Sequence, residues 1–239
     1  MNVLELFSGT GSVGKVCQKL GWNVISVDLE LPATHECDVM DFDYKQYPKD
    51  YFSIVWASPP CTEYSPLKNC WLGRKNNKTG ITLTRELLEK LRKESDKLVL
   101  KTLEIIEYFK PELWCMENPQ RGQLKDREVV KGIPYFDVSY CMYSDWGYEK
   151  RTRIWTNKKD WNNLICDKSG SCGNMVLKKH KLNVSKDVHT IGEKKGKHRL
   201  TMGGNHGTDP NQLHVAGGGS DRLDRYRVPE DLILSLFLD

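Results

Sequence analysis

Short apolar runs alternate with helical patterns along the first half of the chain. Residues 2–7 form an apolar run that ends in a glycine-rich turn, and a helical pattern follows from about Ser12 to Leu20, closed by Gly21. Further runs typical of strands cover 22–28, 52–60, 113–119, 135–143 and 151–157. Strands that alternate with helices in this way predict a mostly parallel sheet with crossover helices.

Two further helical patterns and one irregular stretch complete the chain. Between Ile81 and Lys110, apolar residues recur on one side of a predicted helix. The C-terminal residues 225–239 carry a shorter apolar stripe that predicts a packing helix. From 158 to 212 the periodicity fades, and Gly, Asn, Lys and His dominate. We therefore expect one large α/β unit with a small, loop-rich region inserted near its end.

Composition and charge narrow the class of protein. The chain has 239 residues, of which 38% are hydrophobic and 28% charged, which suits a soluble chain that buries a core. No apolar run approaches the ~18 residues of a membrane helix, and no secretory signal is visible, so we expect an intracellular protein with reduced cysteines. The net charge is only +4, but basic residues are concentrated between Lys178 and Arg199. That concentration favours a nucleic-acid partner.

A glycine-rich turn follows the first predicted strand. Gly9, Gly11 and Gly14 have the G-x-G-x-x-G spacing, and Asp28 ends the next predicted strand. Such glycines let the backbone approach a ligand, and an acid at this place accepts hydrogen bonds from ribose hydroxyls. The acid and the aromatic residue within 5–7 suit a cationic ligand that carries adenosine. The pattern therefore favours a cofactor such as S-adenosylmethionine over a turn without a ligand.

Several residues with candidate chemistry stand at the ends of other predicted strands. Cys61 follows two prolines at a strand end, where a thiolate could act as a nucleophile, and we expect a neighbouring positive field to lower its pKa. Glu117 could hold a proton at a ring nitrogen. Arg151 and Arg153 alternate along a strand and so share one face, which suits a carbonyl oxygen or a phosphate. Asp38 is a candidate for binding an adenine amino group.

The segments FSGTGSVG, SPPC, ENP and EKRTRIW, in this order, resemble the motifs of the cytosine-C5 DNA methyltransferase family. The resemblance implies an α/β Rossmann-like, S-adenosylmethionine-dependent methyltransferase sheet with helices on both faces and a small irregular recognition region. It implies a catalytic, cofactor-binding domain at 1–157, completed by 213–239, and a target-recognition region at 158–212. The implied substrate is double-stranded DNA with a flipped cytosine, and the implied protein is a monomer of the compact phage, virus or restriction–modification type.

The resemblance also assigns roles to residues. Cys61 would attack C6 of the cytosine, Glu117 would engage N3 and the amino group, and Arg151 and Arg153 would bind near O2. C5 would then take the methyl group, a base would remove the C5 proton, and the cysteine would leave. The implied cofactor pocket comprises Phe7, Ser8, Gly9, Gly11, Asp28, Leu29, Asp38, Val39 and Pro60. The loop after the cysteine resembles the mobile catalytic loop of the family and carries Lys68, Arg74, Lys75 and Lys78.

Departures from the family pattern keep other functions open. Pro119 stands where the family has valine, Glu149 stands where it has glutamine, and the final cofactor-side motif is not found. A DNA-binding homologue with impaired catalysis is therefore one alternative. A tRNA cytosine-C5 methyltransferase is another, although its Cys-Phe-Thr signature is not found. A nicotinamide-dependent oxidoreductase would rest on the glycine turn alone.

Histidines and cysteines in the irregular region raise the question of a metal. Cys166, Cys172, His180 and His189 could form a zinc site, but five residues separate the two cysteines, which is not a usual zinc spacing. We therefore expect no metal in the active site, and zinc elsewhere stays an alternative.

Overall fold

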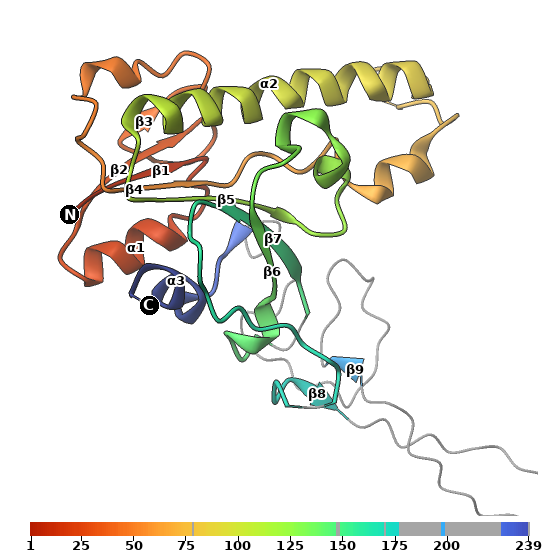
Figure 1. Ribbon diagram of the computed structural model, residues 1–239. Helices are drawn as coiled ribbons and strands as arrows, with labels where there is room; N and C mark the ends of the chain where they lie inside the picture. The colour runs from red at the N-terminus through yellow and green to blue at the C-terminus, as the bar shows by residue number, and fades with distance from the viewer. Residues whose placement is uncertain (78, 147–148, 170, 177–196, 199–225, 239) are drawn as a thin grey trace, which may run out of the picture.

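A seven-stranded sheet forms the centre of the computed structural model (Figure 1), which describes residues 1–77, 79–146, 149–169, 171–176, 197–198 and 226–238. The strand order is β3-β2-β1-β4-β5-β7-β6. The first five strands in this order pair in parallel, and β7 runs antiparallel to both of its neighbours. The strands are β1 (Asn2–Leu6), β2 (Asn23–Asp28), β3 (His35–Glu36), β4 (Ile54–Ala57), β5 (Leu113–Pro119), β6 (Tyr135–Ser139) and β7 (Arg151–Thr156).

Helices cover both faces of the sheet. The long helix α2 (Arg85–Phe109) crosses one face, and α1 (Ser12–Lys19) and α3 (Glu230–Leu238) lie together on the other (Figure 1). This confirms the expected α/β, Rossmann-like sheet with helices on both faces. The remaining described elements are η1 (Tyr44–Gln46), η2 (Pro66–Trp71), η3 (Gln123–Asp126), η4 (Glu128–Val130), η5 (Tyr140–Met142), β8 (Met175–Val176) and β9 (Lys197–His198).

The two faces of the sheet carry separate apolar cores, because the central strands are buried on both sides. Leu4 and Leu6 of β1 pack with Ile105 of α2 in one core. Val3 of the same strand packs with Leu232 of α3 in the other. The period of two along β1 thus sends alternate side chains to opposite layers, which fixes the register of the sheet.

Most predicted elements are confirmed, but two strands are clearly shorter than predicted. The strand within 52–60 covers only Ile54–Ala57. The run 135–143 stays in the sheet to Ser139, its Tyr140 N–H still donates to the Lys150 carbonyl over 3.0 Å, and the chain then turns into η5. The C-terminal helix starts at Glu230.

The predicted target-recognition region, 158–212, lies outside the described residues except for 158–169, 171–176 and 197–198. Residues 213–225, which the family resemblance assigned to the catalytic domain, also lie outside the described residues. None of the helices in the described part of the chain has the length and apolar character needed to cross a membrane.

Candidate active site

The sequence-predicted site residues come together at one edge of the sheet. Phe7 and Cys61 follow the carboxyl ends of β1 and β4, Asp28 is the last residue of β2, and Glu117 lies near the carboxyl end of β5. Because β7 is antiparallel, its first residue, Arg151, lies at this same edge. In open α/β sheets, ligands bind outside the carboxyl ends of the parallel strands. The topology therefore gathers the candidate residues where chemistry is expected.

The loop after β1 has left-handed backbone at three positions. Phe7, Gly9 and Gly11 have φ values of 56°, 53° and 66°. Two glycines make this conformation accessible, whereas Phe7 adopts it at a cost in strain, which is typical of ligand-binding loops. Ser8 is buried within the loop, and its N–H donates to the Val27 carbonyl over 3.1 Å.

Glu5 anchors this loop from below. Its carboxylate accepts hydrogen bonds from the backbone N–H groups of Val13 (3.2 Å) and Gly14 (2.9 Å) at the start of α1. A Cβ on Gly14 would lie 2.7 Å from Glu5 Oε2, so only glycine fits there. Burial raises the pKa of Glu5 to about 7, although both hydrogen bonds oppose the rise. Glu5 therefore holds β1 to α1, and it also lines the pocket at the glycine loop.

Asp28 ties the end of β2 to the glycine loop. Its Oδ2 accepts a hydrogen bond from the Gly9 N–H over 2.7 Å, and its Oδ1 accepts from the N–H groups of Glu30 and Leu31, both at 2.9 Å. The next residue, Leu29, is 65% exposed at the same edge. An exposed leucine beside a fixed carboxylate gives this edge both an apolar surface and a polar anchor.

The other predicted cofactor residues differ in exposure. Asp38 follows β3, is half-buried, and accepts the Met40 N–H over 2.9 Å. Val39 is buried in the core under α2. Pro60 is exposed directly before the cysteine. A Cβ on Gly9 would lie 3.5 Å from the Tyr226 Cβ, so the segment before α3 packs on the glycine loop.

Two anchors hold the turn that carries Cys61. The Asn118 side chain donates to the Pro59 carbonyl over 2.9 Å and so joins the SPPC and ENP motifs. On the other side of the turn, the Tyr64 N–H donates to the Cys61 carbonyl over 3.1 Å. Tyr64 is fully buried, and its hydroxyl donates to Asp96 of α2 over 2.9 Å. The half-buried thiol of Cys61 is therefore fixed to both β5 and α2.

Glu117 has two partners that the sequence analysis missed. Its carboxylate accepts the Tyr140 hydroxyl over 3.2 Å and lies 3.3 Å from the Lys150 ammonium group. The Lys150 Nζ also lies 4.6 Å from the centre of the Tyr140 ring. The sequence held a signal for this partner. Side chains alternate along a strand, so Lys150, directly before Arg151, faces the opposite side of the sheet from the two arginines, and Glu117 lies on that side.

Arg151 and Arg153 share one face, as predicted, but their hydrogen bonds go to other groups. Arg153 forms two bonds to Asp137, of 2.7 and 2.9 Å, and lies 3.5 Å above the Tyr135 ring centre. Arg151 donates to Glu149 over 2.9 Å and to the Cys166 carbonyl over 3.2 Å. Among the described residues, the cation paired with Glu117 is Lys150. The acid at 149 in place of the family's glutamine serves to hold Arg151.

The Cys61 thiol has a raised pKa, contrary to the sequence-based expectation. Burial raises its pKa most, the charge of Glu117 raises it further, and Lys150 lowers it by less. The expected positive field is therefore present, but the pair formed with Glu117 largely cancels it. In this state of the protein the thiol keeps its proton at neutral pH.

The loop after Cys61 folds into η2 and a short hairpin. Lys75 and Thr82 form an antiparallel bridge, and Arg74 lies 5.7 Å from the ring centre of Trp71. Lys68 pairs with Glu63 over 2.9 Å. Lys78 lies outside the described residues. Three large apolar side chains of this loop are more than half exposed: Leu67, Trp71 and Ile81.

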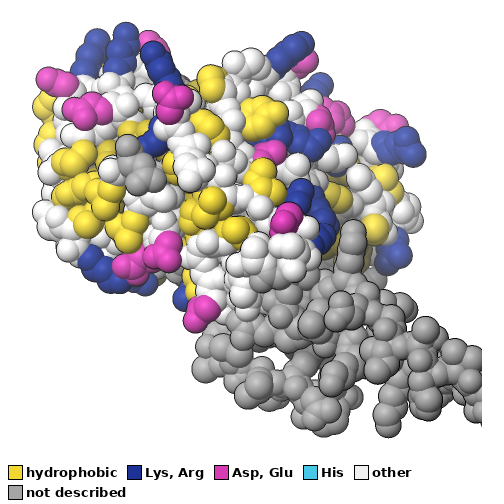
Figure 2. Space-filling view, turned by 60° about the horizontal axis from the view of Figure 1, so that its bottom comes forward, with side chains coloured by type: hydrophobic (Ala, Val, Ile, Leu, Met, Phe, Trp, Pro, Cys, Tyr) yellow, Lys and Arg dark blue, Asp and Glu magenta, His cyan; other side chains and the backbone are white. Residues whose placement is uncertain are grey.

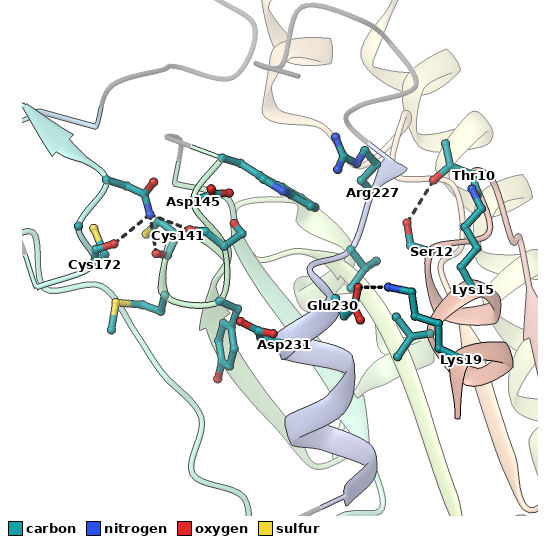
Figure 3. Close-up of a pocket in the computed structure, with 18 residues that line it drawn as sticks. Thr10, Ser12, Lys15, Lys19, Cys141, Asp145, Cys172, Arg227, Glu230 and Asp231 are labelled. Carbon is teal, nitrogen blue, oxygen red and sulfur yellow. Dashed lines mark hydrogen bonds and ion pairs between the residues drawn. The ribbon is translucent and has the colours of Figure 1, made fainter. Parts of the chain in front are cut away.

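A cavity of about 830 Å³ lies beside the glycine loop (Figure 3). Thr10, Ser12 and Lys15 line one side of it, and Cys141 and Cys172 line the other. On the face in Figure 2, basic side chains are interspersed with acidic ones.

The basic stretch between Lys178 and Arg199 lies outside the described residues, except for 197–198. The charges described at the site therefore belong to local ion pairs, such as Lys150 with Glu117.

Comparisons with known proteins agree with the motifs. Models of known protein families, scanned against the chain, give no match. The chain is 36% identical over 242 residues to a protein of Frog virus 3 (isolate Goorha) named "Probable DNA (cytosine-5)-methyltransferase", and the match covers 99% of this chain and 98% of that protein. A solved methyltransferase structure from Entamoeba histolytica is similar at 16% identity and a TM-score of 0.46, over 70% of this chain and 55% of that one. The near-complete match to the viral protein shows that the chain belongs to the DNA (cytosine-5)-methyltransferase family.

Proposed function

We propose that the chain methylates C5 of cytosine in DNA through a transient covalent bond between Cys61 Sγ and C6 of the base. The observation that carries this proposal is the hydrogen bond from Asn118 to the Pro59 carbonyl. It fastens the turn of the cysteine to the strand of Glu117. A nucleophile and a buried carboxyl group on adjacent strand ends suit attack on a ring carbon with proton transfer at a ring nitrogen.

The residues at the strand ends fit a cofactor of the S-adenosylmethionine type. The left-handed loop at Phe7, Gly9 and Gly11 leaves its backbone open to a ligand, and Leu29 offers an exposed apolar surface. Asp28 and Asp38 supply carboxylates for hydroxyl and amino groups. In this proposal S-adenosylmethionine supplies the methyl group when bound, and Ser8, Val39 and Pro60 shape the walls of its site.

In the proposed reaction the protein supplies a nucleophile, a group that holds a proton at N3, and a base. The Cys61 thiol transfers its proton to water, and the electron pair of the thiolate forms the bond to C6, which moves electron density toward N3 of the ring. Glu117 holds a proton at N3 and so neutralises that density. After methyl transfer a base removes the C5 proton, and the bond between sulfur and C6 breaks, which restores the aromatic ring.

Lys150 is a positioning residue for this reaction. It pairs with Glu117, and both side chains are about nine-tenths buried. We propose that Arg151 and Arg153 bind the base near O2 or the adjacent phosphate. In Arg153, Nε and Nη2 donate to the two oxygens of Asp137, so the proposed contact with the base would use Nη1 or would replace one of these bonds.

DNA is the proposed substrate because the target carbon is reached only when the base leaves the stack. The loop after Cys61 suits the stabilisation of an opened duplex. It combines the exposed apolar side chains of Leu67 and Trp71 with the cations Arg74 and Lys75. We propose a catalytic, cofactor-binding domain at 1–157 with 213–239, and a target-recognition region at 158–212.

The test is a trapping experiment with duplex DNA that contains 5-fluorocytosine. With fluorine at C5 there is no C5 proton for a base to remove, so the adduct on the cysteine persists after methyl transfer. We expect a stable protein–DNA complex that depends on S-adenosylmethionine, and we expect Cys61→Ala to abolish it. Cys17→Ala, in the core beside α1, is the matched control and keeps the adduct.

Other outcomes would identify the alternatives. Duplex binding without any adduct would contradict the enzymatic proposal and leave a DNA-binding homologue. An adduct on a tRNA that carries 5-fluorocytosine, with none on DNA, would contradict the assigned substrate. Trapping by Cys61→Ala itself would overturn the assignment of the nucleophile.

A further inference from the structure

Three cysteine side chains from separate segments meet beside the proposed active site. The sulfur atoms of Cys141, Cys166 and Cys172 all lie within 4.8 Å of one another. Cys141 belongs to η5, Cys166 to the stretch after β7, and Cys172 to the turn before β8. Figure 3 shows Cys141 and Cys172 near each other on the cavity wall. We propose that this three-cysteine cluster binds a zinc ion through its thiolates.

The spacing of the sulfur atoms suits a metal better than a disulfide. Zinc binds thiolates at about 2.3 Å in a tetrahedron, so that bound sulfur atoms lie about 3.8 Å apart. A disulfide would join two sulfur atoms at about 2.05 Å and leave the third beside it. The structure forms no disulfide. Three converging soft ligands select zinc among common divalent ions, and a water molecule or a further side chain would complete the tetrahedron.

The backbone around the cluster is held as expected for a built metal site. The buried side chain of Asn174 places its Nδ2 2.9, 2.7 and 2.9 Å from the carbonyl oxygens of Cys141, Ser144 and Cys172. The Lys168 N–H donates to the Cys166 sulfur over 3.4 Å, in a turn where Lys168 has a left-handed φ of 64°. Such contacts orient metal ligands and stabilise thiolates.

A bound zinc ion would also supply cohesion that the segment otherwise lacks. Between β7 and β8 the described chain has no helix or strand, so few backbone ladders hold it. A metal link between η5 and this segment would add to the contacts that Trp161 and Leu164 make with the core. The Cys166 carbonyl accepts a hydrogen bond from Arg151 over 3.2 Å, so the site would hold that arginine as well.

The first test is the metal content of the full chain, purified with a reducing agent and without chelators. Elemental analysis is expected to find one zinc per chain, and Cys141→Ser, Cys166→Ser and Cys172→Ser are each expected to lose it. Cys70→Ser is the matched control, because this exposed thiol lies far along the chain on η2, and this variant is expected to keep its zinc. A wild-type protein that holds no zinc after incubation with Zn²⁺ and desalting would overturn the proposal.

A second test uses the wild-type chain and so does not depend on whether the variants fold. Replacement of zinc by Co²⁺ should give the thiolate-to-cobalt charge-transfer absorption and the visible bands of a tetrahedral site. A spectrum without the charge-transfer absorption would contradict thiolate ligation. Peptide mass spectrometry that finds a disulfide between any two of the three cysteines in the metal-loaded protein would overturn it too.

Discussion

The ion pair between Glu117 and Lys150 places two opposite charges near the thiol of Cys61. Lys150 lowers the pKa of Cys61, whereas Glu117 and burial raise it. Any change that removes the lysine therefore leaves the acid to act alone on the thiol. At the scale of single residues, burial and a pair of opposite charges, rather than one activating group, set the pKa of this thiol.

We predict that Lys150→Met slows the reaction of Cys61 with iodoacetamide up to about tenfold at neutral pH, because loss of the ammonium charge raises the pKa of the thiol further and leaves less thiolate. The rate-against-pH curve should move to higher pH, and Lys150→Arg should restore most of the shift. Peptide mass spectrometry isolates the modification of Cys61 from that of other cysteines. Lys97→Met, an exposed change on α2, is the control. An unmoved curve in the methionine variant would show that Lys150 does not act on the thiol.

At the scale of elements, the seating of α1 on β1 depends on one buried acid. Glu5 satisfies two N–H groups at the start of the helix, and no side chain of the helix caps them. Its pKa is raised to about 7 by burial, from an ordinary value of 4.5. Between these two values the folded chain binds more protons than the unfolded chain, so the free energy of unfolding falls as pH rises.

We predict that this loss between pH 4.5 and pH 7 amounts to at most about 3 kcal/mol and that Glu5→Gln flattens it. Below pH 7 the protonated acid and the glutamine each present one carbonyl acceptor, but the glutamine NH2 group would face a backbone N–H donor, so the variant should lose about 1 kcal/mol in the pH range where the wild type is most stable. Urea denaturation from pH 5 to pH 8 measures both effects. Glu107→Gln, on the exposed side of α2, is the control. Equal pH slopes in wild type and Glu5→Gln would contradict this account.

Elements were predictable where local signals agree, and contacts across the sheet were not. The apolar runs, glycines and prolines around β1, β4 and β5 specified strands and turns directly, so the sites of Cys61 and Glu117 could be placed at strand ends. The partner of Glu117 required knowing that β7 inserts antiparallel beside β5 and that Lys150 therefore faces the acid. The cysteine cluster was missed for a similar reason, because Cys141 joins Cys166 and Cys172 only after η5 turns the chain.

At the scale of the whole molecule, the C-terminal helix α3 packs against β1 and α1, which lie at the start of the chain. Leu232, Ile233 and Leu236 of α3 are fully buried against the sheet and α1. Tyr226 packs on Gly9 just before this helix. The exposed ion pair between Lys19 and Glu230 also joins α1 to α3, but exposed pairs contribute little to stability. Apolar burial is therefore what holds the C-terminal segment over the glycine loop.

We predict that Ile233→Ala lowers the free energy of unfolding by about 2–5 kcal/mol, because it empties a fully buried site, whereas Lys19→Ala changes it by less than about 1 kcal/mol. Because α3 and the glycine loop belong to one packed unit, the isoleucine variant should still unfold in a single transition. S-adenosylmethionine should stabilise wild type and Lys19→Ala equally, since ligand binding adds the same free energy to both. Thermal denaturation with and without S-adenosylmethionine measures the stability of each variant, the number of unfolding transitions and the stabilisation by the ligand. A separate low-temperature transition in Ile233→Ala would show that the C-terminal helix folds apart from the domain.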